Sequence, residues 1–183
     1  MPRSTPNILV TGTPGVGKSS LCAEVVKQVN FEWIEISKVA KSRECISGYD
    51  EELNCPIIDE DKVIDELDPV VESGGKIIEY HGCDFFPERW FDKVFVVRAN
   101  NTILYDRLQE RAYSDLKIRK NIECEIFQSI LEEAMSSYEP SIIQELHNNN
   151  ASDMEQNTAI IVEWINTWLQ NNEKSKNEMF GSK

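Results

Sequence analysis

Apolar residues follow two alternating patterns along this chain: short apolar-rich runs, and stretches in which they recur every three to four positions. Short runs of this kind are typical of strands buried inside a sheet. The predicted strands are residues 7–11, 31–36, 76–80, 93–98 and a short last one at 142–143. The longer spacing predicts helices, because it places apolar side chains on one helix face. The predicted helices run from 18 to 29, 59 to 73, 100 to 111, through 126–134 up to Pro140, and 152 to 169. This alternation favours an α/β fold in three layers, a five-stranded parallel sheet with helices on both faces.

Two segments interrupt the alternation. Residues 37–58 are rich in charge, contain Gly48 and Pro56 and show little periodicity, so an irregular functional insertion is expected there. A shorter charged segment, 112–120, precedes the helix through 126–134. Because no linker divides the remainder, residues 1–171 are predicted to form one domain, and the polar residues 172–183 a flexible tail.

Composition narrows the class of protein. The chain has 183 residues, 40% of them hydrophobic, which suits a single well-formed core. No apolar run approaches the roughly 18 residues of a membrane span, so no membrane association is expected. The five cysteines have irregular spacing and form no Cys-x-x-Cys pair, which argues against a zinc-bearing lid and favours reduced thiols in a cytosolic or nuclear protein.

The chain is strongly acidic, with a formal net charge of −13 from 32 acidic and 19 basic residues. An acidic surface repels a polyphosphate backbone, so the charge disfavours direct nucleic-acid binding. The negative charge suits a basic protein partner. It is equally consistent with a charge whose only role is to keep the protein in solution.

A glycine-rich segment between the first predicted strand and the first helix carries the strongest chemical signal. Residues 12–19 read GTPGVGKS, which matches the phosphate-binding loop: Gly, four residues, Gly-Lys, then Ser or Thr. Glycines let consecutive backbone N–H groups point at phosphate oxygens. Lys18 would supply an ammonium to the β and γ phosphates, and Ser19 a hydroxyl to Mg²⁺. The predicted nucleotide site comprises Gly12, Gly15, Val16, Gly17, Lys18 and Ser19.

Candidate chemical groups follow the third predicted strand. Glu79 closes this strand, where a phosphate loop needs an acid to orient the water shell of Mg²⁺; Asp84 in the next loop is the alternative. Glu79 is also consistent with a carboxylate that merely pairs with a cation. His81 would lie over the phosphates and position an attacking water, or it is structural. Arg89 is either a phosphate ligand or an exposed solubilising residue.

Cations gather before and within the charged segment that is expected to form a lid. They are Arg107, Arg111, Lys117, Arg119 and Lys120. Phosphoryl transfer requires neutralisation of charge from the side opposite the phosphate loop, together with exclusion of water. Arg111 is the main candidate, because it stands where the predicted helix gives way to the lid. The alternative is a solvated helix end with its cations near the negative end of the dipole.

Several motifs together resemble the adenylate kinase isoenzyme 6 family, that of the coilin-interacting nuclear ATPase. They are TGTPGVGK at 11–18, GYDEE at 48–52, DED at 59–61, HGCDFFPER at 81–89 and ECEIF at 123–127. The phosphate loop is generic, whereas the 81–89 motif is far more specific, and the resemblance covers about residues 7–169. It implies a P-loop, adenylate-kinase-like fold with a monophosphate-binding segment at about 35–58 and a short lid at about 110–120.

The resemblance also implies activities, partners and location. It implies Mg²⁺-dependent transfer of a phosphoryl group from ATP to AMP or another nucleoside monophosphate, and a slower ATPase. It implies a role in late maturation of the small ribosomal subunit (18S rRNA), with a basic small-subunit ribosomal protein as partner. It implies a location in the nucleus and cytoplasm.

Residue roles carry over from the resemblance position by position. Those implied to hold ATP are Gly15, Gly17, Lys18, Ser19 and Ser20, with Arg111 closing from the lid. Lys41 would face the monophosphate, and His81 would serve hydrolysis. Two positions depart from the family. Glu79 stands where relatives have Asp, which affects Mg²⁺ geometry, and Ala112 stands where Gly usually follows the lid arginine, which stiffens the hinge.

Three functions remain open from the sequence. The first is an enzyme that catalyses ATP + AMP ⇌ 2 ADP, with Lys18 and Arg111 stabilising the transferred group. The second is a nucleotide-gated assembly factor in which hydrolysis at His81 switches affinity for a basic ribosomal protein. The third is a kinase of the same fold that acts on a small metabolite.

Overall fold

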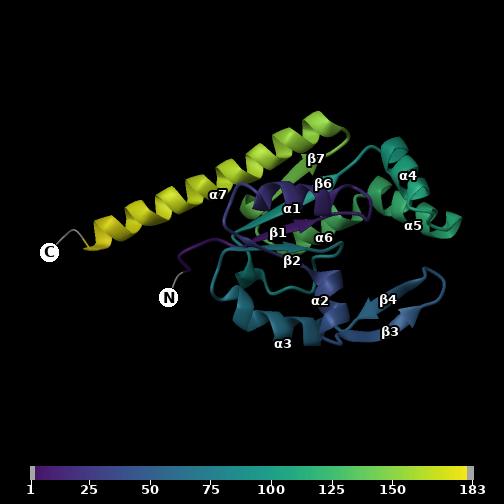
Figure 1. The fold of residues 1–183 in the computed structure, drawn as a ribbon, viewed down its shortest axis with the longest axis horizontal. Coiled ribbons are helices and arrows are strands. Elements are labelled where there is room, and N and C mark those ends of the chain that lie inside the picture. Colours follow the sequence, from purple (N-terminus) through teal and green to yellow (C-terminus); the bar gives the residue numbers. More distant parts are fainter. Residues whose placement is uncertain (1–2, 181–183) are drawn as a thin grey trace.

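The computed structural model describes residues 3–180, with the backbone alone for 176–180. Its centre is a five-stranded, fully parallel sheet in the order β2-β5-β1-β6-β7 (Figure 1). The strands are β1 Ile8–Thr11, β2 Glu32–Glu35, β5 Lys76–Glu79, β6 Lys93–Arg98 and β7 Ile143–His147. The predicted five-stranded parallel sheet is therefore confirmed, and β1, which carries the phosphate loop at its end, lies at its centre.

Helices cover both faces of this sheet, as predicted. They are α1 Lys18–Val26, α2 Ile36–Ser42, α3 Glu60–Val71, α4 Asn101–Glu110, α5 Asp115–Ile126, α6 Ser129–Ser137 and α7 Ala151–Phe180. The chain also forms two 3₁₀ turns, Glu88–Trp90 and Pro140–Ile142. Among residues 3–180, no helix combines the length and the apolar composition that crossing a bilayer requires.

The alternation of side chains along β1 explains the three layers. Ile8 and Val10 point to the face covered by α1 and α7, where they pack with Leu21 and Ile161. Leu9 points to the opposite face. Each of these three strand residues is at most 1% exposed, because a parallel sheet with helices on both sides has no solvated face.

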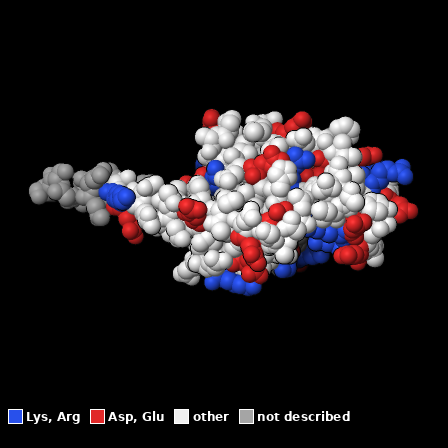
Figure 2. Space-filling view, turned by 90° about the horizontal axis from the view of Figure 1, so that it is seen from above, with Lys and Arg blue, Asp and Glu red and all other residues white. Residues whose placement is uncertain are grey.

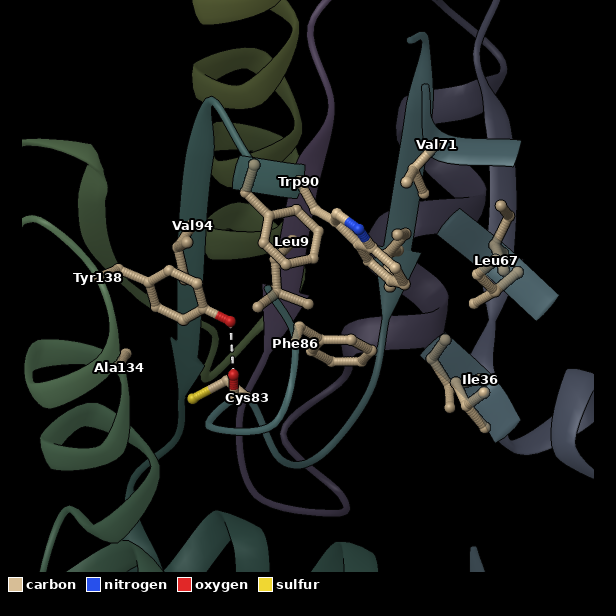
Figure 3. Close-up of a cluster of buried hydrophobic side chains, with 14 of the residues drawn as sticks. Leu9, Ile36, Leu67, Val71, Cys83, Phe86, Trp90, Val94, Ala134 and Tyr138 are labelled. Carbon is tan, nitrogen blue, oxygen red and sulfur yellow. Dashed lines mark hydrogen bonds between the residues drawn. The ribbon is translucent and has the colours of Figure 1, made fainter. Parts of the chain in front are cut away.

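The second core, on the α3 and α6 side, fixes the segment that follows β5. Figure 3 shows Leu9 in this core with Phe86 and Trp90 on one side of it and Tyr138 on the other. The Tyr138 hydroxyl donates a hydrogen bond to the carbonyl oxygen of Cys83. The chain therefore turns into the core shortly after His81.

The insertion predicted to be irregular is ordered. Residues 37–58 contain most of α2 and an antiparallel hairpin of β3 Ile46–Asp50 and β4 Cys55–Ile58. The hairpin lies outside the main sheet (Figure 1), and Tyr49 and Ile57 are about half exposed, at 51% and 49%. Apart from Ile58, which packs against the core on the α3 side, the hairpin residues lie outside the cores, so the sequence lacks the apolar alternation by which strands are recognised.

Two helix boundaries also differ from prediction. The helix expected through 126–134 is two helices, α5 and α6, separated at Gln128, which adopts a left-handed backbone with φ of +57°. The last helix does not end near Leu169 but continues to Phe180 and projects beyond the sheet (Figure 1). The expected flexible tail is thus helical through residue 180, because Gly and Pro are absent from 172–180; residues 181–183 lie outside the described part.

Candidate active site

A cavity of about 530 Å³ opens at the carboxyl ends of the parallel strands. Its walls come from the phosphate loop, the end of β5, α2, the β3–β4 hairpin and the junction of α4 and α5. In open α/β sheets ligands bind at this edge, so the position itself favours a nucleotide site.

The phosphate loop needs glycine where the sequence provides it. Gly12 and Gly17 have φ of +140° and +102°, a conformation that side-chain-bearing residues rarely adopt. A Cβ on Gly12 would lie 2.1 Å from the Val97 carbonyl oxygen, and one on Gly17 would lie 2.3 Å from Nδ2 of Asn148. Gly17 also caps α1 without a side-chain hydrogen bond, which leaves the N–H groups of the first turn available to a phosphate.

Lys18 lies inside the loop rather than in solvent. It is 7% exposed, and its ammonium donates hydrogen bonds to the carbonyl oxygens of Gly12 at 2.6 Å and Thr13 at 3.1 Å. Burial lowers the pKa of Lys18 to about 8, against the opposing charge of Glu79. The side chain is therefore a desolvated, mostly protonated cation at neutral pH, which binds phosphate more strongly than a hydrated one.

Ser19 and Glu79 form the predicted metal-binding pair. The Ser19 hydroxyl donates to Oε1 of Glu79 at 2.7 Å, and the Glu79 side chain is buried, at 6% exposure. Burial raises the pKa of Glu79, and the hydrogen bond from Ser19 and the charge of Lys18 oppose this. A hydroxyl and a carboxylate are the hard oxygen donors that Mg²⁺ prefers, so these two residues fit this ion. Asp84, the alternative, is exposed and lies outside the cavity walls.

His81 follows β5 and lines the same cavity. Its ring centroid lies 4.1 Å from that of Tyr80. Water reaches the imidazole at the cavity surface, yet the surrounding protein removes part of its hydration. This desolvation, with the charges of Lys18 and Lys117, lowers the pKa of His81 to about 4. The imidazole is neutral at physiological pH and able to accept a proton from a water molecule.

Cations converge on the cavity from its other walls. Arg111 ends α4 and is exposed, and its charge contributes to the lowered pKa of Lys18. Lys41 lines the cavity from α2, and Lys117 and Lys120 line it from α5. The cavity is thus basic inside a strongly acidic protein, as an anionic substrate requires.

The remaining residues of the predicted nucleotide site lie in or beside the loop. Gly15, Gly17 and Ser20 line the cavity. Val16 is fully buried, and its carbonyl oxygen accepts hydrogen bonds from Asn148 at 2.8 Å and Arg107 at 3.3 Å. Val16 therefore holds the loop in place, and Arg107 belongs to this support because it also bonds the carbonyl oxygen of Asn148.

Arg89, a candidate phosphate ligand for the monophosphate, does not line this cavity. Its guanidinium pairs with Asp68 on α3, and it lines a separate depression together with Arg3 and Trp168. The physical reason is the burial of Trp90 in the α3–α6 core, which carries the end of the 81–89 motif away from His81.

The structure adds residues that the sequence analysis did not identify. Trp33 on β2 donates its indole N–H to Oε2 of Glu79 at 3.0 Å. Thr13 of the loop donates to the buried carboxylate of Glu125 at 2.6 Å. The only sequence signal for Trp33 was an aromatic residue within a predicted strand. Its contact with Glu79 could not be predicted without knowing that β2 is the neighbour of β5.

Comparisons with known proteins agree with this geometry. A family model described as an AAA domain matches residues 8–128. The adenylate kinase isoenzyme 6 homolog of Drosophila melanogaster is 50% identical over 167 residues, which cover 91% of this chain and 95% of the relative. The homolog of Dictyostelium discoideum is 46% identical and covers 93% and 97%. The adenylate kinase isoenzyme 6 homolog FAP7 of Saccharomyces cerevisiae is 43% identical, over 92% of this chain and 86% of the relative.

A solved shikimate kinase from Bacteroides thetaiotaomicron has the same fold, with a TM-score of 0.59 over 88% of this chain and 99% of that chain, at 15% identity. The phosphate loop, the sheet order and the sequence relatives lead to one conclusion. The chain belongs to the adenylate kinase isoenzyme 6 family and is an enzyme of the nucleotide-kinase type.

Proposed function

We propose that the protein is a nucleoside monophosphate kinase that catalyses ATP + AMP ⇌ 2 ADP with Mg²⁺. The observation that carries this proposal is the arrangement of charge around one cavity. Lys18 and Ser19 lie at the phosphate loop, while Lys41 and Arg111 line other walls of the same space. A donor and an acceptor that both carry phosphates need cations on both sides of the transferred group.

The proposed transfer needs no covalent intermediate on the protein. An oxygen of the monophosphate attacks the γ-phosphorus of ATP, the bond to the β–γ bridging oxygen breaks, and ADP leaves. Lys18 and Arg111 stabilise the negative charge that spreads over the transferred group. Ser19 would be a ligand of Mg²⁺ and Glu79 would orient its water shell, and the bound ion would supply positive charge to the reaction. The loop N–H groups hold the triphosphate in line with the acceptor.

An additional ATPase activity forms part of the proposal. When water occupies the acceptor position, the neutral imidazole of His81, which lines the cavity, would orient this water and accept its proton. Binding of a polyphosphate would raise the pKa of His81 toward its ordinary value, because negative charge stabilises imidazolium. His81 therefore has the protonation behaviour that a general base requires.

We also propose a role in late maturation of the small ribosomal subunit, with a basic small-subunit ribosomal protein as partner and a location in nucleus and cytoplasm. The net charge of −13 supports a basic partner. Figure 2 shows acidic side chains spread over the face seen from above rather than gathered in one patch. The alternative function is a nucleotide-gated assembly factor with secondary kinase activity, and the presence of His81 in the cavity favours it.

One coupled assay tests the kinase proposal against the alternative. ADP formation is measured with ATP and Mg²⁺ in the presence of AMP, CMP, UMP or no acceptor. The kinase proposal predicts that AMP accelerates ATP consumption well above the rate without acceptor. An equal rate with and without every monophosphate would contradict the kinase proposal and favour the ATPase-driven assembly factor.

A further inference from the structure

The carboxylate of Glu79 has two hydrogen-bond donors, one on each oxygen. Oε1 accepts from the Ser19 hydroxyl at 2.7 Å, and Oε2 accepts from the indole N–H of Trp33 at 3.0 Å. The first donor belongs to the phosphate loop and the second to strand β2. A carboxylate held at both oxygens cannot rotate about its last bond without losing one of these contacts.

The sheet and its flank fix Trp33 in this position. Strand β2 pairs with β5, so Trp33 lies beside Ile77 and Glu35 lies beside Glu79. The ammonium of Lys38 lies 5.4 Å above the Trp33 ring, and Lys38 in turn pairs with Glu35 at 2.8 Å. The indole is therefore held by the backbone of a buried sheet on one side and by a cation over its face on the other.

Because Glu79 is buried, losing its hydrogen bond from Trp33 would change the orientation of the carboxylate. At 6% exposure, the carboxylate has little access to solvent that would replace a lost donor. Without the indole N–H, Oε2 would be left unpaired and the side chain would be free to turn toward other donors, such as Lys18, whose charge lowers the pKa of Glu79. The oxygen that faces Ser19 would then no longer be fixed.

We propose that Trp33 is a positioning residue that orients Glu79 for the Mg²⁺ of a bound Mg–nucleotide. The inference rests on the proposed function, because it requires a nucleotide at the phosphate loop. Residues behind the metal ligands typically change metal affinity by about 10- to 100-fold when they are removed. Glu79 is one methylene longer than Asp, and it contacts both Ser19 and Trp33.

The test is calorimetry of ADP with the full-length protein, once with Mg²⁺ and once with EDTA. The ratio of the two affinities measures how much Mg²⁺ strengthens binding. In Trp33→Phe we expect this ratio to fall about tenfold or more, with the affinity for Mg²⁺-free ADP unchanged. Trp164→Phe is the matched control, because it makes the same change on α7, where Trp164 packs against Phe95.

A double-mutant cycle separates positioning from general packing. In Glu79→Asp the shorter carboxylate cannot reach both donors, so adding Trp33→Phe should change the Mg²⁺ ratio by less than about twofold. Three results would overturn the role of Trp33 without touching the proposed function. They are an equal loss of ADP affinity with and without Mg²⁺ in Trp33→Phe, an unchanged Mg²⁺ ratio in Trp33→Phe, and the same tenfold effect of Trp33→Phe in the Glu79→Asp background. Failure of the wild-type protein to bind ADP at all would contradict the proposed function as well.

Discussion

The ammonium of Lys120 lies 3.0 Å from the carboxylate of Glu52, so an ion pair joins α5 to the turn of the β3–β4 hairpin. Lys120 lines the cavity from α5, and Leu53, next to Glu52, lines it from the hairpin. The pair therefore links α5 to the β3–β4 hairpin at the rim of the cavity. Both side chains are exposed, at 45% and 65%, so the interaction is weak and screened by salt.

Breaking this pair should loosen acceptor binding. In Glu52→Gln we expect the KM for AMP to rise about two- to fivefold with little change in kcat, the size expected of an exposed ion pair. Added salt should raise the KM of the wild type more than that of the variant. Glu51→Gln is the matched control, because Glu51 makes no ion pair with a residue of the described part. An equal effect of the two substitutions would contradict the role of the pair.

Lys18 should reduce stability while it enables catalysis. Its folded pKa of about 8 lies below the ordinary 10.5, so between these pH values the unfolded chain binds more protons than the folded one. The wild-type free energy of unfolding therefore rises with pH across this window. Lys18→Met should be more stable at pH 7 by on the order of 1–3 kcal/mol, and this advantage should shrink toward pH 10.5.

The measurement is denaturant unfolding of both proteins from pH 7 to 10. The same variant should lose phosphoryl transfer by orders of magnitude, because the transferred group loses its buried cation. A Lys18→Met variant that is less stable than the wild type at pH 7, with a difference independent of pH, would contradict the assignment of Lys18 as a desolvated cation.

The strands and the phosphate loop were predictable because each depends on local sequence. Buried parallel strands read as apolar runs, and the loop pattern has fixed spacing, so β1, its loop and α1 follow from residues 7–29. The structure also brings Lys18, Ser19 and His81 to one cavity, since all lie at the carboxyl ends of central strands.

The rest depended on contacts between distant residues. The hairpin in 37–58 contacts the core mainly through Ile58 at its end, so its strands lack a clear apolar pattern. Arg89 is directed away from the cavity by the burial of Trp90, which the 81–89 motif alone does not reveal. The contact of Trp33 with Glu79 requires β2 and β5 to be neighbours, although the segments lie far apart in sequence. Only this contact gives a physical reason for Glu, instead of Asp, at position 79.

His81 should affect hydrolysis and leave nucleotide binding intact. In His81→Gly we expect acceptor-free ATP hydrolysis to fall by about 10²-fold or more, the typical contribution of a general base. The affinity for ATP should change little, because the loop and Lys18 remain. Hydrolysis assays and calorimetry of the same preparations provide both measurements, and a parallel loss of affinity and rate would contradict this division.

The titration of His81 provides an independent check. Its pKa of about 4 lies below the ordinary 6.5, so the unfolded chain binds more protons between these values and the group reduces stability as pH falls through this window. NMR of the imidazole resonances in the nucleotide-free protein should show His81 titrating well below pH 6. Titration at or above 6.5 would contradict the desolvated environment.

Glu125 should be the most stability-critical acid near the site. Its carboxylate is 3% exposed, accepts from Thr13 at 2.6 Å and pairs with Nε of Arg98 at 2.9 Å. Glu125→Ala would leave Arg98 without its buried partner, so we expect a loss of about 3–5 kcal/mol in the free energy of unfolding. Glu145→Ala removes the other, 35% exposed partner of Arg98 and should cost less than about 1 kcal/mol. Similar losses in both variants would contradict a buried pair.

In the proposed reaction, the γ-phosphoryl group of ATP passes to a monophosphate in the cavity between Lys18 and Arg111. Its most direct test is to incubate the protein with γ-labelled ATP, Mg²⁺ and AMP, and to locate the label. We predict label in the β-phosphate of newly formed ADP for the wild type, and none for Lys18→Ala. If all the label appears in inorganic phosphate, at a rate that does not depend on AMP, transfer of the phosphoryl group to AMP is contradicted.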